Sequence, residues 1–216
     1  MKTRGNSPVD AVYEHVKRQI ITKELFPGNR IVEEELARET QVSRTSIRTA
    51  LTRLRYEGFV DTHANRGTFV ARPTIEDIRV VYETRSLLEG EAIRLAAARM
   101  TGEGLARMEE NLERQRELRK NFSILQYVSL NREFHWEFIQ AAGNPYYEKY
   151  LNELFNKSGV YLMFFDSSVD NSGSLVNHTA ILDALKRGDG RAAREAVWAD
   201  NRLGIADTHS EKDKPY

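Results

Sequence analysis

Apolar residues recur at three- and four-residue steps in the first part of the chain, and this spacing predicts three amphipathic helices. Pro8 fits the first turn of the first helix, and the turn sequence at residues 26–29 ends it. Gln41 and Val42 form a bend before the third helix, and we expect Ser43 to be its N-cap. The apolar positions are Val9, Val12, Val16 and Ile20 in the first helix, Val32, Leu36 and Ala37 in the second, and Ile47, Leu51 and Leu54 in the third.

The period changes after Gly58. Residues 59–62 and 68–70 are typical of two short strands, and residues 64–67 form the turn between them. Two helices, a tight turn, a third helix with a polar face and a hairpin predict a winged helix-turn-helix. Such a unit suits DNA, because the helix after the turn enters the major groove and a glycine in the wing lets the backbone approach the sugar–phosphate wall.

From residue 73 onward the hydrophobic pattern has only the helical period. We therefore expect a boundary at Pro73, with one domain over residues 1–72 and another over residues 73–216. Thr101 is the expected cap of the second helix beyond the boundary, and Gly143-Asn144-Pro145 ends the third. The predicted fold is mainly α, a winged helix-turn-helix followed by an all-α helical bundle with sites between facing helices. The expected helices lie near residues 78–100, 105–118, 125–142, 147–162, 175–186 and 191–207.

Composition excludes several classes of protein. The 216 residues are 40% hydrophobic, which is enough for a packed core, and they include no cysteine. Disulfide frameworks, thiolate zinc sites and cysteine nucleophiles are therefore excluded. The apolar run at residues 159–165 is far shorter than the ~20 residues of a membrane-spanning helix, and the first eight residues lack an apolar signal core. We expect a soluble, cytoplasmic protein that does not bind membranes.

Charge is balanced over the whole chain but not along it. The formal net charge is zero, with 32 basic and 32 acidic residues, yet residues 1–73 carry an excess of positive charge and the remainder an equal excess of negative charge. A basic first part suits a polyanion. The excess is small enough to arise by chance, so charge alone assigns no function.

Five stretches within residues 9–71 resemble the GntR type of DNA-binding domain. They read PGNRI at 27–31, ELA at 35–37, VSRTSIRTAL at 42–51, LRYEGFV at 54–60 and RGTFV at 66–70. Ser46 and Thr49 depart from the family pattern, which has Pro and Glu at these positions. Neither position is a groove-reading arginine, so the departures affect local helix stability rather than the expected DNA binding.

The resemblance implies a set of DNA-contacting residues on the third helix and the wing. Arg44 and Arg48 would contact bases or phosphates, and the wing would reach the minor groove. The alternative is that both arginines form the solvated face of an ordinary helix. The turn, the wing and the family pattern around them favour DNA. The full expected set is Arg44, Thr45, Ser46, Arg48, Arg66 and Gly67.

Residues 76–207 resemble the FCD ligand-sensing domain, which accompanies the FadR-like branch of the GntR family. The matching stretches are RSLLE at 85–89, NREFH at 131–135, AGNP at 142–145, NHTAIL at 177–182, and GD at 188–189 followed by Ala193. Six expected helices make this domain more similar to the shorter, VanR-like form than to the seven-helix form.

Many FCD domains bind a divalent metal, and the resemblance implies a metal site here. The implied ligands are Asn131, His135, His178 and Asp200. Asn131 and His135 are four residues apart and share one helix face. Asp200 stands where the family has its last histidine, and a one-residue slip would place Asn201 there instead. This oxygen and nitrogen donor set suits zinc, nickel or manganese. The alternative is that each residue is an ordinary buried or capping polar group.

Arg85 and Glu89 lie one turn apart near the start of the bundle. In one interpretation Arg85 pairs with a carboxylate of a bound small molecule, for which its two-pronged guanidinium is suited. In the other it only bridges to Glu89.

The sequence therefore predicts a transcriptional regulator and not an enzyme. It would bind double-stranded DNA at an inverted-repeat operator as a homodimer, because two reading heads must match two half-sites. A small organic acid or similar metabolite would act as the effector and change the affinity of the protein for its operator. This effector could bind through the metal. Two alternatives stay open at this point, a metal-dependent hydrolase and a constitutive DNA binder with a purely structural second domain.

Overall fold

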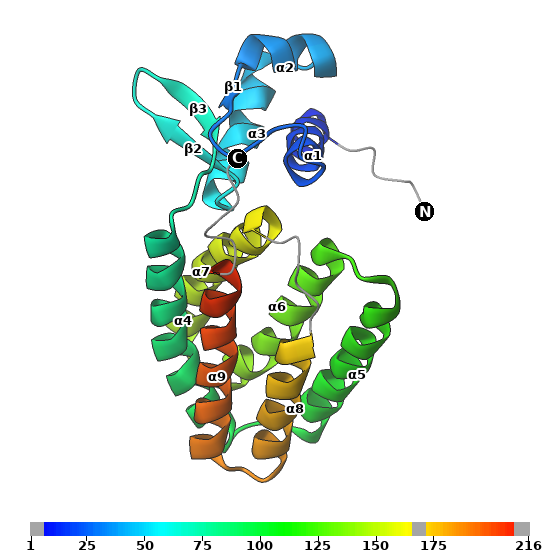
Figure 1. Ribbon diagram of the computed structural model, residues 1–216, viewed down its shortest axis with the longest axis vertical. Coiled ribbons are helices and arrows are strands. Elements are labelled where there is room, and N and C mark those ends of the chain that lie inside the picture. Colours follow the sequence, from blue (N-terminus) through cyan, green and yellow to red (C-terminus); the bar gives the residue numbers. More distant parts are fainter. Residues whose placement is uncertain (1–6, 166–171, 210–216) are drawn as a thin grey trace. The chain divides into compact units, whose positions relative to one another are not determined.

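Residues 7–165 and 172–209 are described by the computed structural model (Figure 1). Contacts between Cα atoms divide the chain into two units, with the boundary between Pro73 and Thr74. Within the described residues, no helix is both long and apolar enough to cross a membrane. The fold is mainly helical, as the sequence predicts, and each unit is considered separately.

Three helices form most of the first unit, and each begins where the local sequence favours a helix start. Ser7 caps the first helix in a reciprocal arrangement with Asp10, and the Ser43 hydroxyl accepts a hydrogen bond from the Ser46 amide at 3.3 Å. Val32 lies at the N-cap of the second helix rather than inside it. The helices are α1 (Pro8–Ile21), α2 (Glu33–Thr40) and α3 (Arg44–Tyr56).

A three-stranded antiparallel sheet completes the first unit. Its strands are β1 (Arg30–Ile31), β2 (Val60–His63) and β3 (Gly67–Val70), in the order β1–β3–β2. The hairpin of β2 and β3 is the predicted wing. Strand β1 was not predicted, because two residues are too few to show a period. Gly67 has a φ of +101°, a backbone conformation that residues other than glycine rarely adopt.

One polar cluster fixes α1 against α3. The Tyr13 hydroxyl donates a hydrogen bond to Glu57 at 2.5 Å, and the Arg53 guanidinium lies over the Tyr13 ring at 3.8 Å. Arg53 also pairs with Asp10 at 3.1 Å. These contacts, together with the buried apolar faces of both helices, fix the position of α3, the helix that follows the tight turn.

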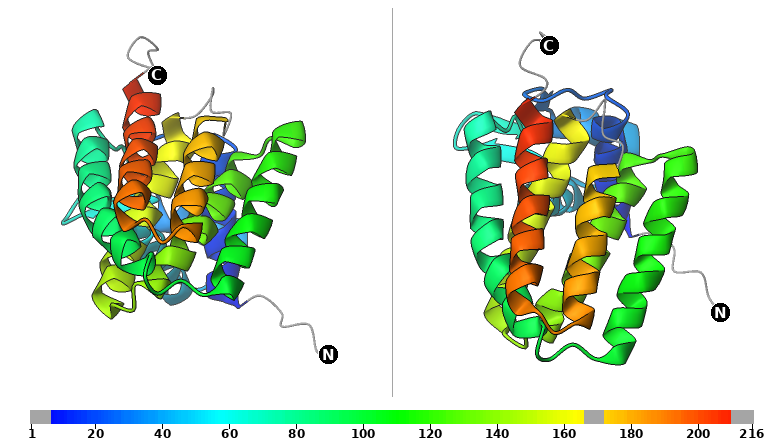
Figure 2. Two further views of the ribbon diagram at one scale, coloured as in Figure 1. Left: turned by 90° about the horizontal axis from the view of Figure 1, so that it is seen from below. Right: turned by 60° about the horizontal axis from the view of Figure 1, so that its bottom comes forward.

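Six α-helices form the described part of the second unit, which confirms the predicted bundle. Figure 2 shows α4, α9, α8 and α5 side by side in one layer, and α6 and α7 cover the other side. The helices are α4 (Ile75–Ala96), α5 (Gly102–Leu118), α6 (Ile124–Ala141), α7 (Pro145–Phe165), α8 (Ser172–Lys186) and α9 (Gly190–His209), and a short 3₁₀ turn, η1 (Arg119–Asn121), follows α5. Thr101 caps α5, as predicted.

The core of this bundle is apolar and closely packed, and α4 and α9 approach each other at a glycine. The Trp198 indole N–H donates a hydrogen bond to the Ser86 carbonyl at 2.9 Å, directly beside Gly90. A Cβ atom added at Gly90 would lie 2.6 Å from the Trp198 ring nitrogen. Because the hydrogen bond fixes the indole, the ring cannot give way without losing it.

We expect Gly90→Ala to destabilise the second unit. Overpacking costs about 1–3 kcal/mol, whereas replacing glycine by alanine inside a helix returns about 1 kcal/mol, so the net change is a loss of up to about 2 kcal/mol. Gly102→Ala is the matched control, because a Cβ atom there meets nothing within 4 Å. Urea unfolding of both variants measures the difference, and equal free energies of unfolding would contradict this account of the α4–α9 contact.

Candidate metal centre

Three helices bring two histidines and an aspartate together inside the bundle. His135 on α6, His178 on α8 and Asp200 on α9 are all buried, and one ligand atom from each lies within 4.8 Å of the other two. The two Nε2 atoms are 3.2 Å apart. The Asp200 carboxylate lies 3.3 Å from Nε2 of His135 and 3.7 Å from Nε2 of His178. These residues are three of the four ligands that the resemblance implied.

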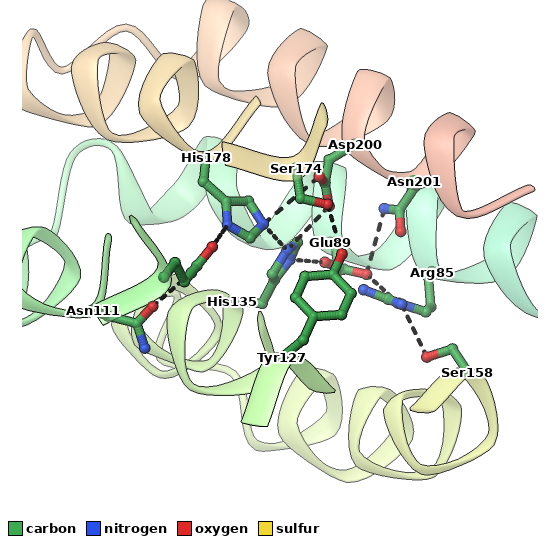
Figure 3. Close-up of polar contacts among 11 residues, drawn as sticks. Arg85, Glu89, Asn111, Tyr127, His135, Ser158, Ser174, His178, Asp200 and Asn201 are labelled. Carbon is green, nitrogen blue, oxygen red and sulfur yellow. Dashed lines mark hydrogen bonds and ion pairs between the residues drawn. The ribbon is translucent and has the colours of Figure 1, made fainter. Parts of the chain in front are cut away.

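Each imidazole is oriented by an acceptor at its other nitrogen. Nδ1 of His135 lies 2.5 Å from the Glu89 carboxylate on α4, and Nδ1 of His178 lies 2.9 Å from the Gln115 side-chain oxygen on α5. Figure 3 shows both rings turned toward Asp200. With a proton on each Nδ1, the Nε2 lone pairs of the two neutral rings point at each other and at a carboxylate.

This arrangement fits a bound cation. Two ligand atoms that each lie about 2.1 Å from a tetrahedral metal are about 3.4 Å apart, close to the three observed separations. In the part of the chain that the structure describes, the buried Oδ1 of Asp200 has no hydrogen-bond partner. Three electron-pair donors that converge without a donor hydrogen between them require either a metal ion or an added proton.

Burial and neighbouring charges shift the pKa values of these groups in different directions. Burial alone would lower the pKa of His135, but the Glu89 and Asp200 carboxylates raise it above its ordinary value. Burial lowers the pKa of His178, and Asp200 only partly offsets it. Burial opposes ionisation of Asp200, yet the two histidines hold the pKa of its carboxyl well below the usual range. An added proton is therefore favoured more on His135 than on His178.

The remaining ligand candidates are also placed. Asn131 is buried one turn before His135 on α6, as the i, i+4 spacing requires for a shared face. The Asn201 amide donates a hydrogen bond to Glu89 at 3.4 Å, so Asp200 rather than Asn201 meets the histidines.

Arg85 joins this centre through Glu89. Its Nε donates to the Glu89 carboxylate at 2.7 Å, and one terminal nitrogen donates to the Ser158 hydroxyl on α7 at 2.9 Å. The guanidinium also lies over the Phe155 ring at 3.9 Å. Only 2% of Arg85 is exposed. The bridge to Glu89 is thus present, whereas contact with a small molecule stays a prediction.

The predicted DNA-contacting residues of α3 lie at the surface of the first unit. Arg44 pairs with Glu34 at 3.0 Å and Arg48 with Glu33 at 2.9 Å, and both arginine side chains are about two-thirds exposed. Thr45 is exposed beside them at the start of α3. These ion pairs with α2 were not anticipated from the sequence.

The remaining predicted DNA contacts are Ser46 on α3 and the wing residues Arg66 and Gly67, and they differ in exposure. Ser46 is half-buried, and its hydroxyl lies 3.1 Å from that of Ser43. On the wing, Arg66 is exposed in the turn and Gly67 begins β3.

Sequence reasoning missed the polar residues that surround the histidines. The sequence pattern indicates Glu89 only as a partner of Arg85, and it gives Asn111 and Gln115 no role. A usable signal exists, because both amides interrupt the apolar stripe of α5 formed by Met108, Leu112 and Leu118, and both are buried. Polar residues at core positions of an amphipathic helix mark a network that must be satisfied inside the fold.

Comparisons with known proteins agree with this architecture. The FCD domain family matches residues 80–201, and the gntR family of bacterial regulatory proteins matches residues 8–70. The solved structure of McbR/YncC from E. coli has a similar fold, with a TM-score of 0.77 and 22% identity, and the likeness covers 96% of this chain and 99% of that one.

Two curated relatives are named as transcription factors, not enzymes. The chain is 39% identical to the Nta operon transcriptional regulator of Aminobacter aminovorans over 118 residues, which cover 55% of this chain and 56% of that protein. It is 26% identical to the transcriptional repressor RspR of Escherichia coli K12 over 187 residues, which cover 86% of this chain and 82% of that protein. The chain thus belongs to the GntR family of bacterial regulatory proteins, in the FadR-like branch whose second domain is an FCD domain.

Proposed function

We propose that this protein is a DNA-binding transcriptional regulator whose operator affinity responds to a small carboxylate effector. The observation that carries the proposal is the exposed start of α3, where Arg44, Thr45 and Arg48 follow the tight turn of a winged helix-turn-helix. Guanidinium and hydroxyl groups at this position suit base edges and phosphates in a major groove. Residues 1–72 would read the DNA, and residues 73–216 would bind the effector.

The protein would act as a homodimer in the bacterial cytoplasm. One reading head per subunit matches an inverted-repeat operator, and Arg66 and Gly67 of each wing would contact the adjacent minor groove. Footprinting on operator fragments tests this directly, because a regulator of this kind protects two half-sites, whereas an architectural DNA binder protects no defined sequence.

Effector sensing would use the buried centre. His135, His178 and Asp200, with Asn131 as the fourth candidate, would hold a divalent zinc, nickel or manganese ion. Such a metal, when bound, supplies open coordination positions that attract a carboxylate. Among the fixed charges of the centre, Glu89 and Asp200 outnumber Arg85 by one, so a divalent cation reverses the sign of the local charge and favours an anionic effector.

Arg85 would orient the carboxylate group of the effector. Its guanidinium is pre-positioned by Glu89, Ser158 and the Phe155 ring, which lowers the entropy lost when a carboxylate replaces one of these contacts. The effector carboxylate would then compete with Glu89 on α4 and Ser158 on α7 for the guanidinium of Arg85.

We expect Arg44→Ala and Arg48→Ala each to weaken specific operator binding by about 1–3 kcal/mol if the side chain reads a base. A residue that contacts only phosphate would weaken all sequences alike, so titration of operator and unrelated DNA separates the two roles. Arg116→Ala is the control, because Arg116 is exposed on α5 and paired with Glu113. Unchanged operator affinity in both α3 variants would refute the assignment.

We expect one divalent ion per chain in protein that has been stripped with a chelator and reloaded. His135→Ala and His178→Ala should abolish most of this uptake, and Asp200→Ala should reduce it less, since water can replace one carboxylate oxygen. Elemental analysis and calorimetry measure the uptake. His15→Ala, in the first unit, controls for the loss of a histidine elsewhere. Equal uptake by wild type and the double-histidine variant would show that these are only buried polar residues.

Metal binding should weaken on acidification. Because the Glu89 and Asp200 carboxylates raise its pKa above the ordinary value, His135 takes up a proton at higher pH than a free imidazole does, and metal binding must release this proton. We expect zinc affinity to fall by about tenfold per pH unit below the folded-state pKa of His135, with about one proton released. Calorimetry in buffers of different ionisation enthalpy measures the proton number. A pH-independent affinity between about pH 5.5 and 8 would contradict this coupling.

A further inference from the structure

We propose that Gln115 is the positioning residue that makes His178 a metal ligand, and that the backbone carbonyl of Leu130 fixes its orientation through Asn111. The inference rests on the proposed metal site but concerns residues outside it. Three hydrogen bonds connect the backbone of α6, through two side chains of α5, to the imidazole on α8. Figure 3 shows Asn111 and His178, which lie on α5 and α8.

The direction of all three hydrogen bonds follows from the first one, between Asn111 and the Leu130 carbonyl. A backbone carbonyl can only accept, so the Asn111 side-chain nitrogen must donate to Leu130 at 3.1 Å. The Asn111 oxygen then faces Gln115 and accepts from its amide nitrogen at 2.7 Å. The Gln115 oxygen, at the other side of the same amide, therefore faces Nδ1 of His178 at 2.9 Å.

This direction decides which tautomer His178 adopts. An amide oxygen can only accept, so Nδ1 must carry the proton, and Nε2 of the neutral ring is left with a free lone pair. The other tautomer would place a hydrogen on Nε2, pointing into the space shared with His135 and Asp200, and that hydrogen would exclude a metal.

Asp200 favours the unwanted tautomer. Its Oδ1 atom lies 3.7 Å from Nε2 of His178 and has no hydrogen-bond partner among the residues that the structure describes. A proton on Nε2 would lie on the side of the ring that faces this oxygen, and the negative carboxylate would attract it. Gln115 opposes this preference from the other side of the ring, and its complete burial raises the cost of leaving its oxygen unpaired. The two acceptors thus compete for one proton, and Gln115 decides the outcome in favour of metal binding.

His135 shows the same logic with a different partner. Glu89 accepts from its Nδ1, so both rings are held from behind while their Nε2 atoms converge. Partners of this kind typically change metal affinity by about 10–100-fold when they are removed. Gln115 achieves the orientation with a neutral amide, and it can be replaced without removing a buried charge.

The test compares two replacements of Gln115 in the full-length chain. Gln115→Leu removes the acceptor, whereas Gln115→Glu keeps an accepting oxygen at the same distance along the side chain. We expect Gln115→Leu to bind zinc about 10–100-fold more weakly, and Gln115→Glu to recover most of the affinity at pH 8. Gln140→Leu, at an exposed position of α6, should match wild type. Calorimetry with zinc alone measures these affinities.

Nitrogen-15 NMR of the metal-free protein shows which ring nitrogen of each histidine carries the proton. If Gln115 only supported the packing of the bundle, its replacement would not change the tautomer of His178. We expect the proton of His178 on Nδ1 in wild type and Gln115→Glu, and on Nε2 for a large fraction of Gln115→Leu. If Gln115→Leu does not fold, Gln115→Met replaces it, because the methionine side chain is unbranched like that of glutamine but lacks the amide oxygen. Unchanged zinc affinity and an unchanged tautomer in the folded variant would overturn the proposal. If wild type binds no zinc but the tautomer of His178 still differs between wild type and Gln115→Leu, the metal site is refuted, and only the control of the tautomer by Gln115 is supported.

Discussion

Convergence of two imidazole nitrogens and one carboxylate inside an apolar bundle is the constraint on which the second unit depends. None of the three atoms brings a hydrogen to the point where they meet, so the packed state needs a cation or an added proton between them. Removing one partner from a buried charged set of this kind costs about 3–5 kcal/mol, a large share of a typical domain's stability. The centre therefore contributes to the stability of the fold.

The same polar network aligns the bundle. Each of the six helices in the described part of this unit supplies at least one side chain to it, and the contacts join helices that are distant in sequence. A shift of one helix by a single turn, about 5.4 Å, would separate its polar group from every partner. Apolar packing alone tolerates such shifts more readily. The members are Arg85 and Glu89 on α4, Gln115 on α5, His135 on α6, Ser158 on α7, His178 on α8 and Asp200 on α9.

Much of this architecture was predictable from the sequence because helix periods and caps are local. The apolar spacing located the helices, and Ser43 and Thr101 marked two helix starts that the structure confirms. Strand β1 was not predictable, since its two residues become a strand only by pairing with β3. Non-local pairing of this kind leaves no periodic signal in a short segment.

Some features of the candidate site were likewise predictable from the sequence, and others depend on the packing of the helices. His135, His178 and Asp200 could be proposed from a family resemblance, but their mutual distances depend on how α6, α8 and α9 pack. The roles of Glu89 and Gln115 follow only from the direction in which each histidine ring faces. A sequence pattern identifies a buried polar residue, whereas the atom that it contacts is a property of the whole bundle.

The ion pairs between α2 and α3 have a consequence for the physics of DNA association. In the free protein, Glu33 and Glu34 already act as counterions for Arg48 and Arg44. If Arg44 and Arg48 contact DNA as proposed, an approaching phosphate would exchange one anion for another instead of neutralising a bare cation, and the two liberated carboxylates would remain near the duplex and repel it. Non-specific attraction to DNA would thereby be weakened at low salt, where it is otherwise strongest. The acidic start of α2 would thus shorten the residence of the protein on DNA that offers these arginines no base to bind.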